Sequence, residues 1–396
     1  MAPRVLFYVQ NLLGIGHIKR AALVSDAMVD QGCDVLVVLG GRDAPGISFD
    51  GATIVRLLAA HVADHTFTPL LNEDGKAVDE AWKQRRTKVL LDTFHAFRPD
   101  VILTEMFPFG RRQFRFELLP LLDAARATEA PPLVISSVRD ILVQKTKPGR
   151  DRQTAAFVRD RFDLVLVHGD PALTTLDETF PEAKSIADLI RYSGYVAPAA
   201  PDANASLTGP DANASMAGRD EVIVSAGGGA VGAPLFIAAM AARPLSSLAH
   251  KTWRFVTGPN LGEDDYHALV QHASDGVIVE RFRADLPHMF TNCALSISQG
   301  GYNTIMDLLR ARTTAIVVPY EDGGESEQRH RAKLLAQRNI LNVIDASMLS
   351  PITLAQAIDH ATPPQPGHID LAGAQTAARI IVEAARNRAD GGIRYA

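Results

Sequence analysis

The sequence predicts an α/β protein with two doubly wound parallel sheets that follow one another along the chain. Short apolar runs alternate with segments of helical apolar spacing, which is typical of a parallel sheet covered by helices. The alternation stops near residue 200, in a stretch poor in large apolar residues, and then restarts. A chain of 396 residues also exceeds one compact core and suits two domains of ordinary size.

The interruption is the clearest domain boundary in the sequence. The hexapeptide Pro-Asp-Ala-Asn-Ala-Ser occupies residues 201–206 and recurs at 210–215. Because this stretch can hardly pack as a core, we predict an interdomain linker or an exposed loop. The predicted divisions are a first domain at 1–197, the linker at 198–219, a second domain at 220–366 and a C-terminal helix within 367–396 that packs back on the first domain.

The first half begins with a predicted strand at 4–9 and a helix at 17–29. The next strand, at 33–39, is mostly apolar, as expected for a strand covered on both faces. The other strands of this half are predicted at 53–58, 101–104, 133–137, 164–167 and 190–196, and its other helices at 78–97, 113–127 and 151–161.

The second half repeats the pattern. Two doubly wound domains in series are expected to turn the ligand loops at their strand ends toward a common cleft. The predicted strands are 221–225, 252–257, 277–280, 294–298 and 314–318, and the predicted helices are 233–242, 264–273, 302–312, 327–338, one that begins at 350–351, and 370–388.

Residues 294–328 combine the features of a nucleotide-binding segment. Gly300 and Gly301 join a strand to a helix start and permit a ligand to approach the backbone closely. The free N–H groups at this helix start, on Tyr302, Asn303 and Thr304, predict an anion site that the helix dipole strengthens.

Three polar residues further along this segment are candidates for binding the ribose and a sugar of such a ligand. Asp307, one turn into the helix, is placed to accept hydrogen bonds from a ribose diol. Glu327 and Gln328 open the following helix and are placed to reach the hydroxyl groups of a sugar.

The order of these residues resembles the donor-binding domain of the two-domain GT-B glycosyltransferases, and most closely glycosyltransferase family 28, which contains the peptidoglycan N-acetylglucosaminyltransferase. The resemblance implies that the glycine turn holds the diphosphate of a UDP-sugar, that Asp307 binds the ribose and that Glu327 and Gln328 bind the sugar. The family usually has Glu where Asp307 stands, and often Gln-Gln or Asp-Gln in place of Glu327-Gln328. The resemblance therefore does not imply which sugar is bound.

A second glycine loop occupies residues 226–232. A generic strand-to-helix turn is the alternative, but four glycines in six residues exceed what a turn needs. In the resembling family this loop approaches the donor phosphates, which implies the same for Gly227, Gly228 and Gly229, with backbone N–H groups alone because Gly229 replaces a Ser. Gln299 stands where many relatives have a His that contacts phosphate.

The first strand-to-helix junction reads G-x-G-H-x-x-R, with Gly14, Gly16, His17 and Arg20. Alone, the motif is equally compatible with a tight turn. A His at a helix N-terminus favours the neutral imidazole, which is a competent base near pH 7. In the resembling transferases this His lies beside the reaction centre, and a similar stretch occurs in the GT-B-like sugar-nucleotide hydrolase of pseudaminic acid synthesis. We expect His17 at the catalytic centre and Gly16 beside the donor.

Other polar residues follow strands of the first half and are expected at the same rim. Glu105 is the alternative base, because the apolar loop after it is expected to raise its pKa. An ion pair with Arg111 or Arg139 is a nearly equal alternative for this carboxylate. The acceptor-side candidates are Arg20, Arg111, Arg139, Asp140 and His168.

Composition excludes several classes of protein. A net charge of −5 without a basic block argues against a nucleic-acid ligand. The two cysteines, Cys33 and Cys293, suit a reducing compartment. No signal-peptide pattern and no apolar run of about 20 residues is present, so we expect a cytoplasmic protein, with peripheral membrane contact left open. Without an Asp-x-Asp motif, we expect no metal, and no cofactor beyond the UDP-sugar as co-substrate.

The predicted function is an inverting, metal-independent glycosyltransferase that moves a sugar from a UDP-sugar to an acceptor whose class, glycan, lipid-linked or small molecule, the sequence does not give. The loop at 42–76 would form an acceptor groove or an ordinary lid. One alternative is a sugar-nucleotide hydrolase with water as the acceptor. Another is a non-catalytic sugar-nucleotide-binding subunit, against which stands the presence of both halves of a site in one chain.

Overall fold

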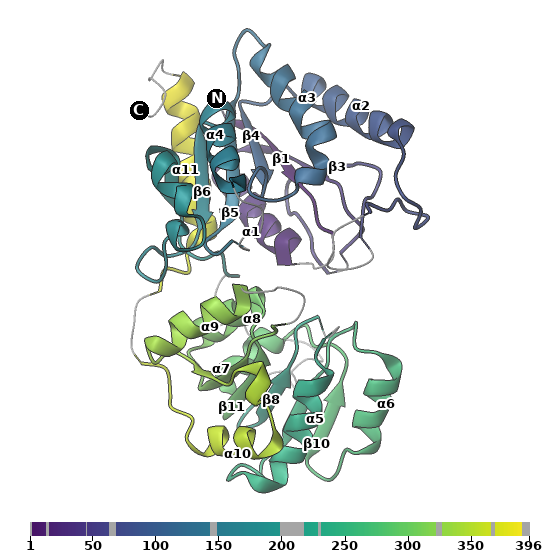
Figure 1. Cartoon of the computed structure of the whole chain (residues 1–396), viewed down its shortest axis with the longest axis vertical. Coiled ribbons are helices and arrows are strands. Elements are labelled where there is room, and N and C mark those ends of the chain that lie inside the picture. Colours follow the sequence, from purple (N-terminus) through teal and green to yellow (C-terminus); the bar gives the residue numbers. More distant parts are fainter. Residues whose placement is uncertain are drawn as a thin grey trace. The chain divides into compact units, whose positions relative to one another are not determined.

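The computed structural model describes residues 2–12, 16–44, 46–62, 69–142, 149–198, 218–228, 231–321, 327–365 and 369–389. The chain forms two compact units (Figure 1). Unit 1 contains Met1–Ala197 and Asp370–Ala396, and unit 2 contains Pro198–Ile369. Each unit is built on one parallel sheet, so the predicted class of two doubly wound α/β domains is confirmed.

The sheet of unit 1 has the strand order β3-β2-β1-β4-β5-β6-β7. The order reverses between β1 and β4, which is the topological switch point where open α/β sheets bind ligands. Successive residues of the first strand enter opposite cores, as its alternating side chains require. The strands are β1 (Arg4–Val9), β2 (Asp34–Leu39), β3 (Thr53–Arg56), β4 (Val101–Glu105), β5 (Leu133–Arg139), β6 (Leu164–His168) and β7 (Ile190–Tyr192).

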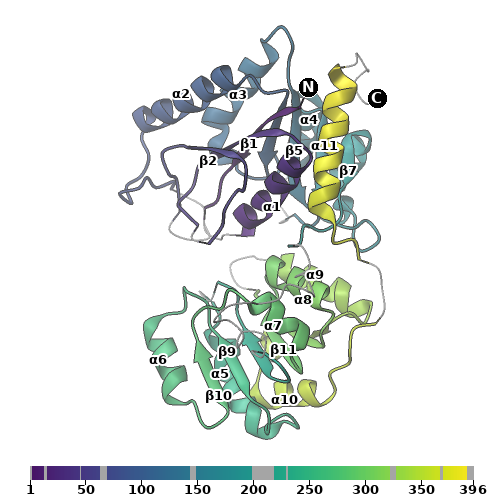
Figure 2. The ribbon, with the colours of Figure 1, turned by 180° about the vertical axis from the view of Figure 1, so that it is seen from behind.

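Helices cover both faces of this sheet. On one face, α1 (Gly16–Asp30) packs against α11 (Gly373–Ala389) (Figure 2). The buried alanines of α11 and Ile381 form its apolar stripe. The other core contains side chains of α2 (Glu80–Phe97), α3 (Arg115–Arg126) and α4 (Arg150–Arg161). Short 3-10 turns complete the unit at η1 (Arg112–Phe114), η2 (Leu176–Glu178) and η3 (Pro181–Leu189).

The segment before α11 is fixed to the end of the sheet of unit 1. The Tyr195 N–H donates to the Asp370 carbonyl at 2.7 Å, and the Gly373 N–H donates to the Tyr195 carbonyl at 3.0 Å. A Cβ atom at Gly373 would lie 2.4 Å from the Gly194 carbonyl oxygen, so only glycine fits there. The strand predicted at 190–196 therefore ends early, and its last residues pair instead with the returning chain through the bridge between Val196 and Ala372.

The sheet of unit 2 repeats the topology in the order β10-β9-β8-β11-β12-β13, with its switch point between β8 and β11. Its strands are β8 (Val222–Ser225), β9 (Trp253–Val256), β10 (Val277–Glu280), β11 (Leu295–Gln299), β12 (Ala315–Val318) and β13 (Asn342–Val343). Its helices are α5 (Ala233–Ala242), α6 (Glu263–Gln271), α7 (Leu286–Asn292), α8 (Tyr302–Ala311), α9 (Glu327–Gln337) and α10 (Pro351–Asp359), with 3-10 turns η5 (Arg243–Leu245) and η7 (Ala346–Met348).

The start of α10 follows the sequence signal closely. The Ser350 side chain accepts a hydrogen bond from the Thr353 N–H, and the Thr353 hydroxyl accepts one from the Ser350 N–H. Pro351 occupies the first helical turn. The core of unit 2 packs α5 and α10 against the sheet. None of the described helices is long and apolar enough to cross a membrane. Most of the predicted linker, residues 199–217, lies outside the described residues.

Candidate active site

Five side chains gather at the switch point of unit 1, and we call them the His17 cluster: His17, Arg20, Glu105, Arg111 and Arg139. His17 and Arg20 lie in the first turns of α1, which follows β1, and Glu105 is the last residue of β4. Arg111 lies in the loop after β4, and Arg139 ends β5. The parallel sheet therefore brings together residues that are more than 100 positions apart in sequence.

Glu105 is the buried centre of this cluster. Its Oε1 atom lies 2.6 Å from His17 Nδ1 and 2.6 Å from Arg20 Nη2. Its Oε2 atom lies 4.0 Å from Arg111 Nη2. Only 1% of the Glu105 side chain is exposed, against 18% for His17. The carboxylate is therefore held by cationic and N–H groups, while the imidazole reaches the edge of the site.

The protonation of Glu105 corrects the sequence analysis. Burial alone raises the pKa of this carboxyl, as expected, but His17, Arg20 and Arg111 together lower it to about 2. The expected raised pKa, on which the role of alternative base rested, is therefore wrong. The alternative of an ion pair with Arg111 is present, and the shorter contact to Arg20 was not foreseen.

The ionised carboxylate assigns the tautomer of His17. Since Glu105 accepts only, Nδ1 carries the proton and donates to it, and Nε2 keeps its lone pair. Burial lowers the pKa of His17 to about 4, with Arg139 and Arg111 adding to the decrease and Glu105 opposing it. The neutral imidazole that the sequence predicts is thus favoured, chiefly by burial. Arg139 Nη2 lies 3.3 Å from Nε2.

The loop after β4, which carries Arg111 of the cluster, has an unusual backbone conformation. Met106 and Arg111 have φ angles of 64° and 56°, a region that side chains other than glycine rarely adopt. Arg111 Nε donates to the Gln10 carbonyl at 2.8 Å and so joins this loop to the exit of β1. Such strain persists only where surrounding contacts determine it, which is common at functional sites.

Two predicted acceptor-side residues do not reach the rim. His168 is fully buried between two serines, with Nε2 2.7 Å from Ser137 Oγ and Nδ1 2.9 Å from Ser193 Oγ. Asp140 is also fully buried and accepts from the Tyr195 hydroxyl at 2.6 Å. The expectation that they line the rim is therefore wrong, because Ser137, Ser193 and Tyr195 bind them in the interior. Burial lowers the pKa of His168 to about 3.

At the switch point of unit 2, two glycine turns meet. Gly227 has a φ of 58°, and a Cβ atom there would lie 3.6 Å from Thr304 Oγ1 on α8. Gly228 accepts from the Asn260 N–H at 3.1 Å through its carbonyl. A Cβ atom at Gly301 would meet none of the described atoms within 4 Å. Gly229 lies outside the described residues, as does Gly14 of the first motif, whereas Gly16 begins α1.

The start of α8 has the character of an anion site. Gly301 is the N-cap residue and supplies no side-chain hydrogen bond, and the first turn holds no acidic residue. The positive end of the helix dipole is therefore not offset within that turn. Asn303, Thr304 and Gln299 are each partly exposed beside it.

The remaining donor-side candidates are more enclosed than the sequence suggested. Asp307 is nine-tenths buried on α8. Glu327 is buried, and its Oε1 atom accepts a hydrogen bond from Arg331 Nη1 at 2.8 Å. The Arg331 guanidinium also lies 5.0 Å from the centre of the Tyr302 ring. Gln328 Oε1 accepts from the Tyr320 N–H at 3.1 Å. Sequence reasoning missed Arg331, whose signal is the four-residue spacing from Glu327 on one helix.

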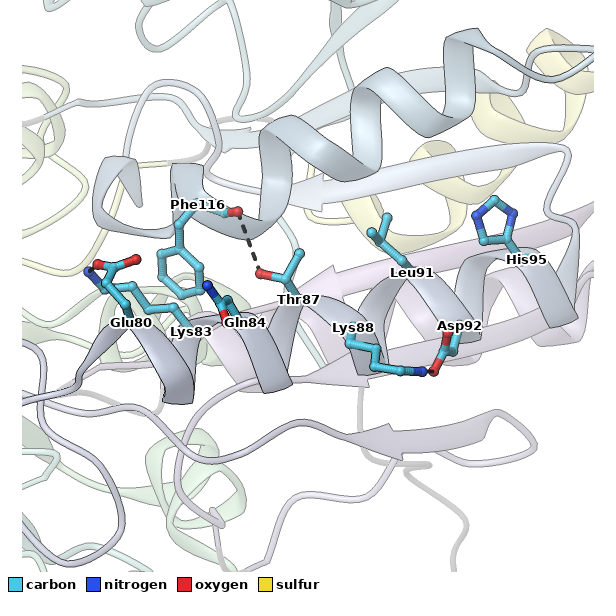
Figure 3. A pocket seen from close by; sticks show the side chains of 9 residues that line it. All are labelled: Glu80, Lys83, Gln84, Thr87, Lys88, Leu91, Asp92, His95 and Phe116. Carbon is cyan, nitrogen blue, oxygen red and sulfur yellow. Dashed lines mark hydrogen bonds and ion pairs between the residues drawn. The ribbon is translucent and has the colours of Figure 1, made fainter.

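A depression of about 500 Å³ lies elsewhere on unit 1, over α2 and Phe116 of α3 (Figure 3). Its charged residues are paired: Lys83 with Glu80 and Lys88 with Asp92, each at 2.6 Å. None of the predicted site residues lines it. In the described part of the chain, no group of three or more His, Cys, Asp and Glu residues is arranged to hold a metal ion.

Comparison with known proteins finds similarity chiefly in the second half of the chain. Residues 223–382 match the model of the glycosyltransferase family 28 C-terminal domain. A transferase of Prochlorococcus marinus (strain MIT 9312), described as UDP-N-acetylglucosamine--N-acetylmuramyl-(pentapeptide) pyrophosphoryl-undecaprenol N-acetylglucosamine transferase, is 26% identical over 99 residues. That match covers 25% of this chain and 27% of the relative. The chain thus spans about a quarter of the length of the curated relatives it matches.

Solved structures share the fold over nearly the whole chain. The calicheamicin glycosyltransferase CalG4 has a TM-score of 0.60 at 12% identity, covering 99% of this chain and 97% of its own. MurG of Acinetobacter baumannii has a TM-score of 0.56 at 16% identity, covering 97% and 95%. At these identities the likeness shows the fold alone.

The two sheets and these neighbours define a protein of the GT-B glycosyltransferase architecture. More particularly, the chain is similar to glycosyltransferase family 28, whose C-terminal domain model matches residues 223–382, so the resemblance drawn from the sequence is confirmed.

Proposed function

We propose that the chain is an inverting, metal-independent glycosyltransferase that uses a nucleotide-sugar donor. The proposal assigns donor binding to unit 2 and proton transfer to the His17 cluster in unit 1. The observation that carries it is the neutral His17 held through Nδ1 by an ionised carboxylate, in a chain with a family 28 C-terminal domain.

Donor binding is supported by the open glycine turns of unit 2. The N–H groups at the start of α8 and the backbone of Gly227, Gly228 and Gly301 suit the diphosphate of the donor, because such amides stabilise charge that grows on a leaving phosphate. Asp307 is assigned to the ribose, and Glu327 and Gln328 to the sugar. A uridine base is proposed from the relatives, whose names specify UDP-N-acetylglucosamine.

The reaction is a single displacement. An acceptor hydroxyl gives its proton to His17 Nε2 while its oxygen forms a bond to the anomeric carbon. The bond from that carbon to the phosphate oxygen breaks, and the nucleoside diphosphate leaves with the electron pair. Attack opposite to the leaving group inverts the anomeric configuration. Glu105 keeps its hydrogen bond to Nδ1 and stabilises the imidazolium that forms.

The acceptor is proposed to be lipid-linked. Support comes from the relatives, whose names specify a pyrophosphoryl-undecaprenol acceptor and which match about a quarter of this chain. A membrane-bound acceptor would bring the protein to the membrane surface as a peripheral protein on the cytoplasmic side. Arg111 and Arg139 remain the acceptor-side candidates of unit 1, whereas Arg20 is buried and binds Glu105.

The test is donor binding by calorimetry together with nucleotide release, using UDP-, dTDP-, GDP- and CMP-sugars with and without a lipid-linked diphosphate saccharide. We expect one donor to bind and release to require the acceptor, with EDTA having no effect. NMR of the product is expected to show the inverted anomer.

Thr304→Val serves as the binding control, because it removes one hydroxyl beside the α8 start and should weaken the donor alone. Rapid release without acceptor would instead favour the hydrolase. Absence of binding to every donor would contradict both the transferase and the hydrolase.

A further inference from the structure

A second buried polar cluster of unit 1 is connected to the His17 cluster through Gln10, and its centre is Arg86 on α2. The Arg86 and Glu117 side chains are both 0% exposed, and Arg86 Nε donates to Glu117 Oε2 at 2.7 Å. The Tyr8 hydroxyl on β1 donates to the other carboxylate oxygen at 2.5 Å. The Glu117 carboxylate thus balances the positive charge of Arg86 within the cluster.

The rest of the Arg86 guanidinium contacts the exits of three strands. Nη1 donates to the Gly40 carbonyl after β2, at 2.8 Å, and to the Leu58 carbonyl after β3. Nη2 donates to Gln10 Oε1 after β1 at 2.6 Å and lies 3.4 Å from the Tyr8 hydroxyl. Five acceptors therefore meet the five N–H groups of the guanidinium, an arrangement that a lysine ammonium cannot reproduce.

Gln10 transmits this contact toward the His17 cluster. Its side-chain amide donates to the carbonyls of Asn11 at 2.7 Å and of Ala60 at 3.3 Å. Its backbone carbonyl accepts from Arg111 Nε at 2.8 Å, and Arg111 in turn faces Glu105. Arg86 is therefore linked to the carboxylate that holds His17 by a continuous series of polar contacts.

The fit around Arg86 is tight. A Cβ atom at Gly40 would lie 2.2 Å from both Arg86 Nη2 and Gln10 Oε1, so a single methyl group would displace one of them. Gly40 is not among the glycines with positive φ, so alanine meets no backbone obstacle there. Gly40→Ala therefore disturbs the contact between Arg86 Nη2 and Gln10 Oε1 without removing any side chain of the cluster.

We propose that Arg86 is a positioning residue: it fixes the loops that leave β1, β2 and β3 and thereby sets the geometry of His17 and Glu105. Its effect on turnover rests on the proposed transferase function. A misplacement of catalytic groups by about 1 Å costs on the order of 100-fold in rate. Donor binding in unit 2 should not depend on Arg86.

The test compares Arg86→Lys and Gly40→Ala with Tyr8→Phe, which removes the hydroxyl contacts to Glu117 and Arg86 but none of the contacts to the loops after β1, β2 and β3. The resting protein is observed first by proton NMR, where the short His17 Nδ1–H bond to Glu105 should give a strongly downfield signal. We expect this signal in the wild type and in Tyr8→Phe, and its loss in the other two variants.

Turnover is measured next, with kcat expected to fall on the order of 100-fold in Arg86→Lys and Gly40→Ala while the donor Kd stays unchanged. Should Arg86→Lys not fold, Gly40→Ala decides the question. An unchanged downfield signal in Gly40→Ala would overturn the inference. Because the signal needs no substrate, this outcome is distinct from a failure of the proposed function, which would appear as absent turnover in the wild type.

Discussion

The two switch points of this molecule share a topology and differ in chemistry. At β1/β4 the strand ends carry a buried carboxylate, a histidine and three arginines. At β8/β11 they carry glycines and an uncapped helix start with no acidic residue. Equivalent edges of the two sheets thus carry different groups. In unit 1 a charged centre sets the protonation state of a histidine, and in unit 2 a neutral backbone surface suits an anion. Fold alone does not assign these roles, and the side chains do.

The largest expected effect comes from breaking one buried pair in each unit. Glu105→Gln leaves Arg20 without its carboxylate, and Glu327→Gln does the same to Arg331. Removing one partner of a buried ion pair costs about 3–5 kcal/mol. We expect each change to destabilise its own unit by this amount.

Tryptophan fluorescence measures the unfolding of each unit separately, since the two tryptophans, Trp82 and Trp253, lie in different units. Chemical unfolding in Trp253→Phe and Trp82→Phe backgrounds then follows unit 1 and unit 2 respectively. In variants that stay folded, Glu105→Gln should lower kcat, whereas Glu327→Gln should raise the donor KM. If either change moved both parameters equally, the proposed division between the units would not hold.

The next effect is the dependence of unit 1 stability on pH. The pKa values of His17 and His168 lie near 4 and 3 in the folded chain, against 6.5 for an unperturbed histidine. Below pH 6.5 the unfolded chain binds protons that the folded chain does not, so stability falls as pH decreases from 6.5 toward 4. Each histidine contributes up to about 1.4 kcal/mol per pH unit.

Urea unfolding of unit 1 at pH 7, 6, 5 and 4, followed through Trp82, measures this slope. His168→Gln is the matched variant, because glutamine retains a donor and an acceptor for Ser137 and Ser193 but does not titrate. We expect a shallower slope in this variant. Equal slopes in the two proteins would show that His168 is not held neutral by burial.

The smallest effect compares two glycines of unit 2. Gly227→Ala forces a side chain into a φ of 58° and should cost about 1 kcal/mol of stability. Gly301→Ala meets no described atom and should leave stability unchanged, yet its methyl group enters the space assigned to the donor. We expect about a ten-fold loss of donor affinity in Gly301→Ala, equivalent to about 1.4 kcal/mol. Unaltered affinity would move the donor away from this turn.

The sequence predicts regular elements well where the pattern is long enough. The strands β1, β2 and β8 are continuous apolar runs, the helix α11 has a clear apolar period, and all four appear where expected. In contrast, α7 has seven residues and β13 has two, too few for a period to be read. The glycine turns could also be predicted from the sequence, because adjacent glycines are seldom needed outside tight turns and close backbone contacts.

The electrostatics of the site could not be predicted in the same way. The pKa of Glu105 depends on His17 and Arg20, which lie 88 and 85 positions earlier and reach it only through the sheet. The burial of Asp140 likewise depends on Tyr195, 55 positions later. A local reading of an apolar loop captures desolvation but not these distant partners, so it gave Glu105 the wrong direction of shift.

The most direct test of the account is donor affinity and turnover of His17→Gln, with the donor and acceptor that the wild type uses. Removal of a general base costs about 10²–10⁴-fold in rate. The account predicts a donor Kd equal to that of the wild type, measured by calorimetry, together with this loss of kcat. Turnover that persists at the wild-type rate would contradict the assignment of His17 as the base.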